Sequence, residues 1–226
     1  MFSMAEQPTK VAVDQSGDVG ARLREVREAA DLSLRELARR IDLSASALSQ
    51  IETGKSRPSV KTLYAIVTEL GISLDELFAN QAGGGAAGLD GESEGRGPAE
   101  DPVQRADSRA SLELDSGVTW DRLTAAHDPE VDFLFTTYAV GGASSSNDKL
   151  VRHNGREYGI VLSGELEVTV GFETHVLHEG DSISFDSQEP HRLANRGDVP
   201  ATAIWFVIGR RGSDPRQPTF DADAAT

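Results

Sequence analysis

The chain has 226 residues, a length that predicts one large domain or two modest ones, and no cysteine, which excludes disulfides, thiolate zinc sites and a cysteine nucleophile. Its formal net charge of -15, from 22 Lys and Arg against 37 Asp and Glu, argues against a protein that coats nucleic acid through its overall charge. The sequence has no apolar run long enough to span a membrane and does not begin with a basic and then apolar leader, so we expect a cytoplasmic protein without membrane contact.

Composition divides the chain into two blocks. Between residues 80 and 107, Gly, Ala, Pro and acidic residues replace any apolar periodicity. Such a stretch buries too little surface to offset its ordering entropy, which predicts a flexible linker. Residues 1–18 and 212–226 are predicted to be disordered tails. Folded blocks remain at residues 19–79 and 108–211, and we expect the linker to keep them apart.

The first block has the periodicity of amphipathic helices, because its apolar residues recur at three- and four-residue steps. Serines that precede apolar runs mark helix starts at Ser33, Ser44, Ser59 and Ser73, and the block is predicted to form five short helices. It contains nine basic and nine acidic residues. The excess of acid therefore lies elsewhere, and only this neutral block is suited to approach DNA.

Only Asp42-Leu43-Ser44 separates the second predicted helix from the third, which requires a tight corner. Residues 37–55 resemble the helix-turn-helix of the phage-repressor-like (Xre) family, and the run Ile51-Glu52-Thr53-Gly54-Lys55-Ser56-Arg57-Pro58-Ser59 is the most specific part of the match. Family members usually have Gly where Asp42 stands, and Asp tolerates a positive φ better than most residues. The resemblance covers residues 19–79.

The third helix of that family enters the major groove of DNA. The resemblance therefore implies a DNA-reading face at the exposed start of this helix, formed by Ala45, Ser46, Ser49 and Gln50. Gln50 is the expected base reader, because its amide can pair with two atoms of adenine. Phosphate contacts are expected from the flanking basic residues, Arg39, Arg40, Lys55 and Arg57. Alternatively, these polar side chains only keep a helical bundle soluble.

The resemblance also implies an ion pair between Arg27 in the first helix and Glu52 in the third.

From Thr119 onward the pattern changes to short β-branched and aromatic runs separated by glycine turns. These predicted strands lie at residues 131–138, 158–162, 165–170, 174–177, 182–185 and 202–207. Strands at such short intervals are typical of an antiparallel sandwich or barrel.

Two stretches of this block resemble the two motifs of the cupin family, over about residues 110–211. The first runs from His153 to Gly164, and the second joins Gly180-Asp181 to Pro190-His191 and Asn195. The resemblance implies a double-stranded β-helix barrel. The expected fold is multidomain, with an all-α five-helix repressor-like domain and an all-β cupin barrel.

Metal-bearing cupins hold a divalent ion with histidines and a glutamate of these motifs. The resemblance assigns His153, Glu157 and His191 to such a site, but Val151 stands where a further histidine is usual. Two histidines and one carboxylate can still hold Fe(II), Zn, Ni or Mn, so a divalent metal is the one candidate cofactor. Alternatively, the three residues are polar liners of an effector pocket, with Tyr158 at its edge.

Together the two resemblances imply a transcription regulator that binds a double-stranded DNA operator and whose cupin domain binds a small-molecule effector. We expect a homodimer, because paired half-sites in DNA require a twofold protein. The alternative is a cupin enzyme, a metal-dependent dioxygenase or isomerase, fused to a DNA-binding domain. The missing histidine and the lack of a second carboxylate at the motif argue against it, so we expect no enzymatic activity and no catalytic residues.

Overall fold

The structure is a computed structural model that describes residues 16–78, 102–126, 128, 130–145 and 149–209. Most of both predicted tails, and residues 80–101 of the predicted linker, lie outside these described residues. The described end of the linker contains a short 3-10 helix, η2 (Ala106–Ser108).

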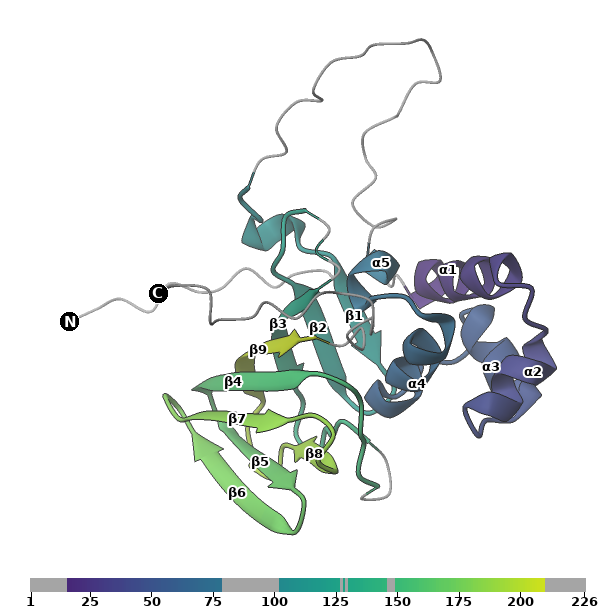
Figure 1. Cartoon of the computed structure of the whole chain (residues 1–226). Helices are drawn as coiled ribbons and strands as arrows, with labels where there is room; N and C mark the ends of the chain where they lie inside the picture. Colours follow the sequence, from purple (N-terminus) through teal and green to yellow (C-terminus); the bar gives the residue numbers. More distant parts are fainter. Residues whose placement is uncertain (1–15, 79–101, 127, 129, 146–148, 210–226) are drawn as a thin grey trace, which may run out of the picture.

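The first block forms the five expected helices, drawn in purple and blue in Figure 1. They are α1 (Ser16–Ala29), α2 (Leu34–Arg40), α3 (Ala45–Glu52), α4 (Val60–Leu70) and α5 (Leu74–Phe78). The predicted caps of α2, α3 and α4 are confirmed, because the side chains of Ser33, Ser44 and Ser59 each accept a hydrogen bond from a backbone N–H of the first turn. No helix within the described residues is both long and apolar enough to cross a membrane.

The corner between α2 and α3 has the backbone that the sequence predicted. Asp42 adopts a φ of 54°, the left-handed conformation for which the family usually has glycine. The expected ion pair is also present, since the guanidinium of Arg27 donates two hydrogen bonds, of 2.7 and 2.9 Å, to the carboxylate of Glu52. Gly20 lets α1 approach α3 closely, because a Cβ at this position would lie 2.3 Å from the carbonyl oxygen of Ile51.

The second block forms two antiparallel sheets that face each other across a barrel (Figure 1). The larger sheet has the order β1-β2-β3-β9-β4-β7, and the smaller has the order β6-β5-β8. The strands are β1 (Ser111–Leu114), β2 (Val118–Arg122), β3 (Val131–Tyr138), β4 (Arg156–Ser163), β5 (Glu165–Val170), β6 (Glu173–His178), β7 (Ser182–Asp186), β8 (His191–Ala194) and β9 (Ala201–Ile208). The six predicted strands are found, while β1, β2 and β8 were not predicted.

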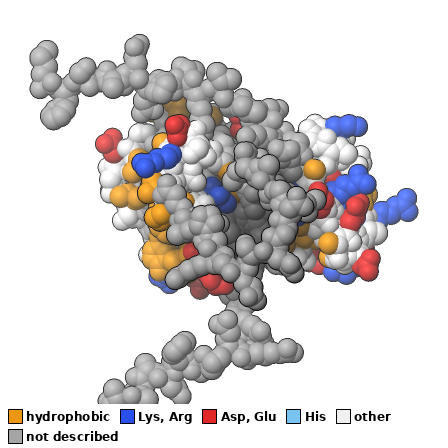
Figure 2. All heavy atoms as spheres, turned by 90° about the horizontal axis from the view of Figure 1, so that it is seen from above, with side chains coloured by type: hydrophobic (Ala, Val, Ile, Leu, Met, Phe, Trp, Pro, Cys, Tyr) orange, Lys and Arg blue, Asp and Glu red, His pale blue; other side chains and the backbone are white. Residues whose placement is uncertain are grey.

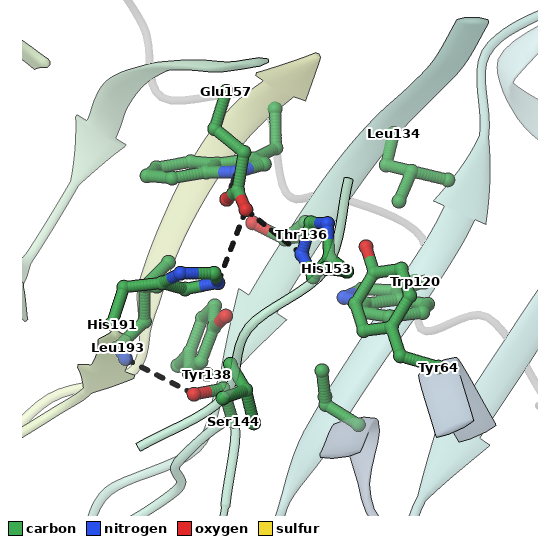
Figure 3. A pocket seen from close by; sticks show the side chains of 13 residues that line it. Tyr64, Trp120, Leu134, Thr136, Tyr138, Ser144, His153, Glu157, His191 and Leu193 are labelled. Carbon is green, nitrogen blue, oxygen red and sulfur yellow. Dashed lines mark hydrogen bonds and ion pairs between the residues drawn. The ribbon is translucent and has the colours of Figure 1, made fainter. Parts of the chain in front are cut away.

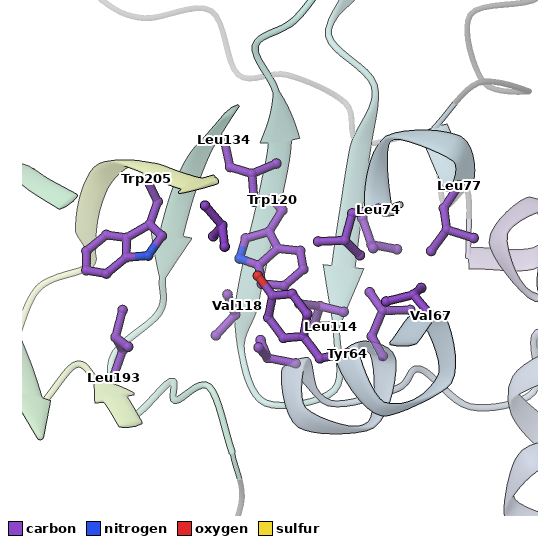
Figure 4. Packing of buried hydrophobic residues seen from close by; sticks show 14 of the residues in the cluster. Tyr64, Val67, Leu74, Leu77, Leu114, Val118, Trp120, Leu134, Leu193 and Trp205 are labelled. Carbon is purple, nitrogen blue, oxygen red and sulfur yellow. The ribbon is translucent and has the colours of Figure 1, made fainter. Parts of the chain in front are cut away.

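The expectation that the linker keeps the two blocks apart is wrong. Helix α4 lies against β1 and β2, and a single cluster of buried hydrophobic residues runs through both blocks (Figure 4). Tyr64 of α4 and Trp120 of β2 meet at its centre, with ring centroids 5.5 Å apart. The physical reason is that α4 carries apolar side chains around more of its circumference than the helical bundle can bury, so the rest is buried against the barrel.

Candidate functional site

The predicted DNA-reading face lies on α3, on the side opposite the core. Leu48, Ile51 and Glu52 are buried, whereas Ser46 and Gln50, one helical turn apart, are exposed. The other two predicted contacts, Ala45 and Ser49, are partly exposed. The helix can therefore present Ser46 and Gln50 to a groove without disturbing its own packing.

The two arginines that precede α3 have carboxylate partners on the helices. Arg39 and Arg40 both pair with Glu36, at 2.7 and 2.8 Å, and Arg40 also pairs with Glu69 at 2.8 Å. Lys55 is exposed. Charges of both signs are accordingly interspersed over the helical side of the molecule, on the right in Figure 2.

Arg57 differs from the other basic residues, because its partner belongs to the barrel. Its guanidinium lies 2.7 Å from the carboxylate of Glu113 on β1. A residue predicted to hold a DNA phosphate is thus paired with an acid of the other block.

Inside the barrel, the structure brings His153, Glu157 and His191 together, as Figure 3 shows. His153 precedes β4, Glu157 lies on β4 and His191 begins β8, and all three are buried. The Nε2 atoms of His153 and His191 lie 3.0 and 3.1 Å from Oε1 of Glu157. Three ligand atoms of the kinds that transition metals prefer therefore face one point.

The surrounding hydrogen bonds orient these ligand atoms. Nδ1 of His153 lies 3.0 Å from the backbone oxygen of Asn154, and Nδ1 of His191 lies 2.8 Å from that of Glu189. Because a carbonyl oxygen can only accept, each Nδ1 must carry the proton, which leaves a lone pair on Nε2 when the imidazole is neutral. The other carboxylate oxygen, Oε2 of Glu157, accepts a 2.7 Å hydrogen bond from Nε1 of Trp205.

The ionisation of the cluster favours a cation. Burial alone would raise the pKa of Glu157, but the two imidazoles beside it outweigh this effect and hold its pKa well below the ordinary value. Burial would likewise lower the pKa of His191, but the Glu157 carboxylate outweighs it and raises that pKa. The carboxylate is therefore negative, and a positive charge beside it is stabilised.

The cluster fits a metal ion by a second criterion. Nε2 of His153 and Oε1 of Glu157 are buried, and among the described residues neither has a partner with hydrogen-bond geometry, although the two atoms are close. Buried polar atoms without a hydrogen bond are costly, and a bound cation would satisfy both. The residues present are thus compatible with a divalent metal held by His153, Glu157 and His191.

The pocket around the cluster is mostly aromatic and apolar (Figure 3). It is lined by Val60, Tyr64, Trp120, Leu134, Thr136, Tyr138, Ser144, Val151, His153, Glu157, His191, Leu193 and Trp205. Val151, which replaces the usual histidine, remains in the wall. Val60 and Tyr64 come from the DNA-binding helices and were not predicted from the sequence. The signal available for them was the unusually wide apolar face of α4.

The prediction that Tyr158 belongs to this pocket is wrong. Tyr158 lies on the outer face of the larger sheet and is 43% exposed. The reason is the alternation of side chains along β4, which directs Glu157 inward and therefore its neighbour outward.

A helical bundle with an exposed third helix, joined to a barrel with a buried His-Glu-His cluster, defines a DNA-binding regulator with a cupin domain. A helix-turn-helix family model matches residues 23–77, and a cupin domain model matches residues 134–207. The chain belongs to the helix-turn-helix transcriptional regulators that carry a C-terminal cupin domain.

Individual relatives agree with this assignment. The HTH-type transcriptional regulator PuuR of Escherichia coli is 29% identical over 178 residues, which cover 78% of this chain and 86% of PuuR. An uncharacterized transcriptional regulator in the ATPase CF(0) region of Rhodospirillum rubrum is 34% identical over 77 residues, 34% of this chain and 71% of that protein. The crystal structure of an HTH_3 family transcriptional regulator from Vibrio cholerae has the same fold, with a TM-score of 0.59 and 23% identity over 85% of this chain and 96% of that one.

Proposed function

We propose that this cytoplasmic regulator binds its operator as a homodimer, and that a small-molecule effector in the barrel pocket changes its affinity for DNA. The observation that carries the proposal is the composition of the pocket wall. Val60 and Tyr64 of α4 line the same pocket as the His-Glu-His cluster of the barrel. A molecule that enters this pocket must therefore either contact or displace the DNA-binding helices.

On DNA, we assign base reading to Gln50 and, beside it, Ser46, with Ala45 and Ser49 at the groove wall. Lys55, Arg39, Arg40 and Arg57 would hold phosphates and set the register of the helix. Arg57 would exchange the carboxylate of Glu113 for a phosphate when it does so.

We also propose that His153, Glu157 and His191 hold a divalent metal ion in the pocket. A metal there would supply a Lewis-acidic point to which an oxygen or nitrogen of an effector can bind. The protein's contribution is to fix the two imidazoles through the backbone and the carboxylate through Trp205.

The barrel acts as a sensor rather than an enzyme in this proposal. Among the described residues that line the pocket, Glu157 is the only carboxylate. A metal that uses it leaves no second carboxylate to act as a general base. The complete His-Glu-His cluster is the observation that favours the alternative, a metal-dependent dioxygenase or isomerase, and turnover of a bound compound would establish it.

The outer face of the larger sheet is suited to the dimer contact. Tyr158, Ile160 and Leu162 of β4 are each about two-fifths exposed, and the first two line a shallow groove over β7 and β9. Hydrophobic side chains gather on this barrel side of the molecule, on the left in Figure 2. A contiguous apolar patch on a sheet is typical of an interface between protein chains. Ile160→Asp should shift the protein to monomer in light scattering, whereas Val176→Asp, at a somewhat more exposed position on β6, should not.

Footprinting on the DNA upstream of its own gene, combined with a thermal-shift screen of amino acids, amines, sulfur compounds and divalent metals, tests the proposed function. A pocket ligand raises the melting temperature by mass action and should also change the footprint. A ligand that stabilises the protein without altering DNA binding would contradict the proposal. The absence of any protected DNA sequence would also contradict it.

A further inference from the structure

The buried pocket is too small for an organic effector as long as Tyr64 occupies its place. The cavity beside the His-Glu-His cluster measures about 20 Å³. By the same kind of measure one water molecule needs roughly 10–15 Å³, so the cavity has room for one water molecule or one ion. A larger ligand can enter only if part of the wall moves.

Tyr64 is the wall that separates this cavity from a much larger open crevice. The crevice measures about 590 Å³, within the range of small-molecule sites, and lies between α2 and α4 on one side and the barrel on the other. Its barrel wall is formed by Leu150, Val151, Arg152 and Pro190. Of the described residues, Tyr64 and Val151 alone line both the crevice and the buried cavity. They therefore stand between solvent and the cluster.

The Tyr64 ring rests directly on a member of the cluster. It stacks on the imidazole of His153 with a centroid distance of 4.4 Å and an interplanar angle of 24°, and it also lies beside the indole of Trp120. Tyr64 is only 7% exposed. Figure 3 shows the ring beside Trp120 and His153, with Leu134 above them in this view.

The helix that carries Tyr64 is docked on the barrel by a few polar contacts besides this ring. The backbone N–H of Lys61 donates to the carbonyl oxygen of Ser144 at 3.2 Å, and that of Asp115 donates to the carbonyl oxygen of Pro58 at 3.0 Å. Each is a single hydrogen bond between backbone groups. The polar part of the docking is therefore slight, and the rest is apolar packing, which the apolar part of a ligand can replace.

We propose that Tyr64 is a removable plug of the effector site. An effector enters from the crevice, displaces the Tyr64 ring from His153 and takes its place, so that effector binding and docking of α4 exclude each other. Because the vacated space is bounded by the stacked imidazole face of His153 and by the indole of Trp120, tilted 58° from the ring, the ligand has a flat part of about the size of a phenol ring. The inference rests on the proposed function in that it takes this pocket as the effector site.

The free side chain of tyrosine, p-cresol, is the probe that tests the plug. Full-length Tyr64→Ala should bind p-cresol in isothermal titration calorimetry at least tenfold more tightly than the wild-type protein, because the variant leaves the ring's space empty. Phe172→Ala is the matched control, since it removes a fully exposed aromatic ring between β5 and β6 and should bind no better than the wild type. Tyr64→Phe keeps the ring and should also behave like the wild type.

Amide hydrogen exchange tests the link to docking. Tyr64→Ala should speed exchange at Lys61 and Asp115, whose N–H groups join the two blocks, and leave exchange within β5 and β6 unchanged. If Tyr64→Ala does not fold, Tyr64→Leu removes the ring while keeping an apolar side chain, and the same results are expected.

Equal p-cresol binding by the wild type and the folded variant, or unchanged exchange at both amides, would overturn the plug. Neither measurement involves DNA. A protein that passes both tests but whose operator affinity responds to no pocket ligand would instead contradict the proposed function.

Discussion

The ring of Tyr64 stacks on the imidazole of His153, although the two residues lie 89 positions apart and belong to different functional parts of the regulator. His153 in turn contacts Glu157, the centre of the buried cluster. A change at that cluster therefore reaches the DNA-binding helices across one aromatic contact. Coupling between the two parts does not need to pass along the linker.

The Arg27–Glu52 pair should be a main determinant of the stability of the helical bundle. Glu52→Gln removes the buried negative partner and leaves the guanidinium with only the exposed carboxylate of Glu28, 3.4 Å away, which should cost up to about 3–5 kcal/mol of unfolding free energy. Denaturant unfolding of the full chain measures this loss. Glu25→Gln, which breaks the exposed pair with Arg22, is the control and should cost less than about 1 kcal/mol. Similar losses in both variants would contradict the prediction.

Gln50 and Lys55 should affect DNA binding in different ways. Gln50→Ala is expected to lower affinity for the operator by about 1–3 kcal/mol and to leave affinity for random DNA nearly unchanged, because it removes a base contact. Lys55→Ala should weaken both and reduce the slope of the salt dependence by about one, since it removes a phosphate contact. Fluorescence anisotropy at several salt concentrations separates the two effects. Equal loss on both DNAs for Gln50→Ala would refute its role as a base reader.

The helices and most strands could be predicted from the sequence because their signals are local. Ser33, Ser44 and Ser59 cap helices through their own side chains, and β-branched runs between glycines mark six of the strands. Strand β8 was missed because His191, Arg192, Leu193 and Ala194 are all buried, so it shows no alternation. The hairpin of β1 and β2 has the alternating pattern Leu112, Leu114, Val118 and Trp120, and could have been found.

The cluster could be predicted from motif spacing, but its surroundings could not. Tyr64 and Trp205 reach the pocket because segments that are distant in the sequence pack against each other. Such contacts leave no local pattern in the sequence. The error at Tyr158 has a different origin. Its proximity to Glu157 along the chain suggested a shared pocket, whereas adjacent residues of a strand face opposite sides.

Glu113 should restrain Arg57 from binding DNA. Glu113→Gln removes the carboxylate that lies 2.7 Å from the guanidinium and also a negative charge beside the approaching phosphates. Affinity for operator and random DNA alike should rise by up to about fivefold at low salt, as expected of an exposed pair worth about 0.2–1 kcal/mol. Glu173→Gln, an exposed acid on β6, removes the same charge far from the helices and serves as the control. If both variants gain equally, net charge rather than the pair is responsible.

The buried cluster should bind one divalent metal ion whose affinity depends on Trp205. His191→Ala removes a ligand and should abolish binding of Co(II), measured by calorimetry and by the visible absorption of the bound ion. Trp205→Phe keeps all three ligands but loses the hydrogen bond to Oε2 of Glu157, which should weaken binding about 10- to 100-fold. Trp120→Phe removes another indole of the same pocket wall. Its affinity for Co(II) should stay within about threefold of that of the wild type, because a residue outside the ligand set affects metal binding through contact with a ligand. Equal weakening in the two tryptophan variants would assign the effect to packing, and failure of the wild type to bind Co(II) would refute the metal site.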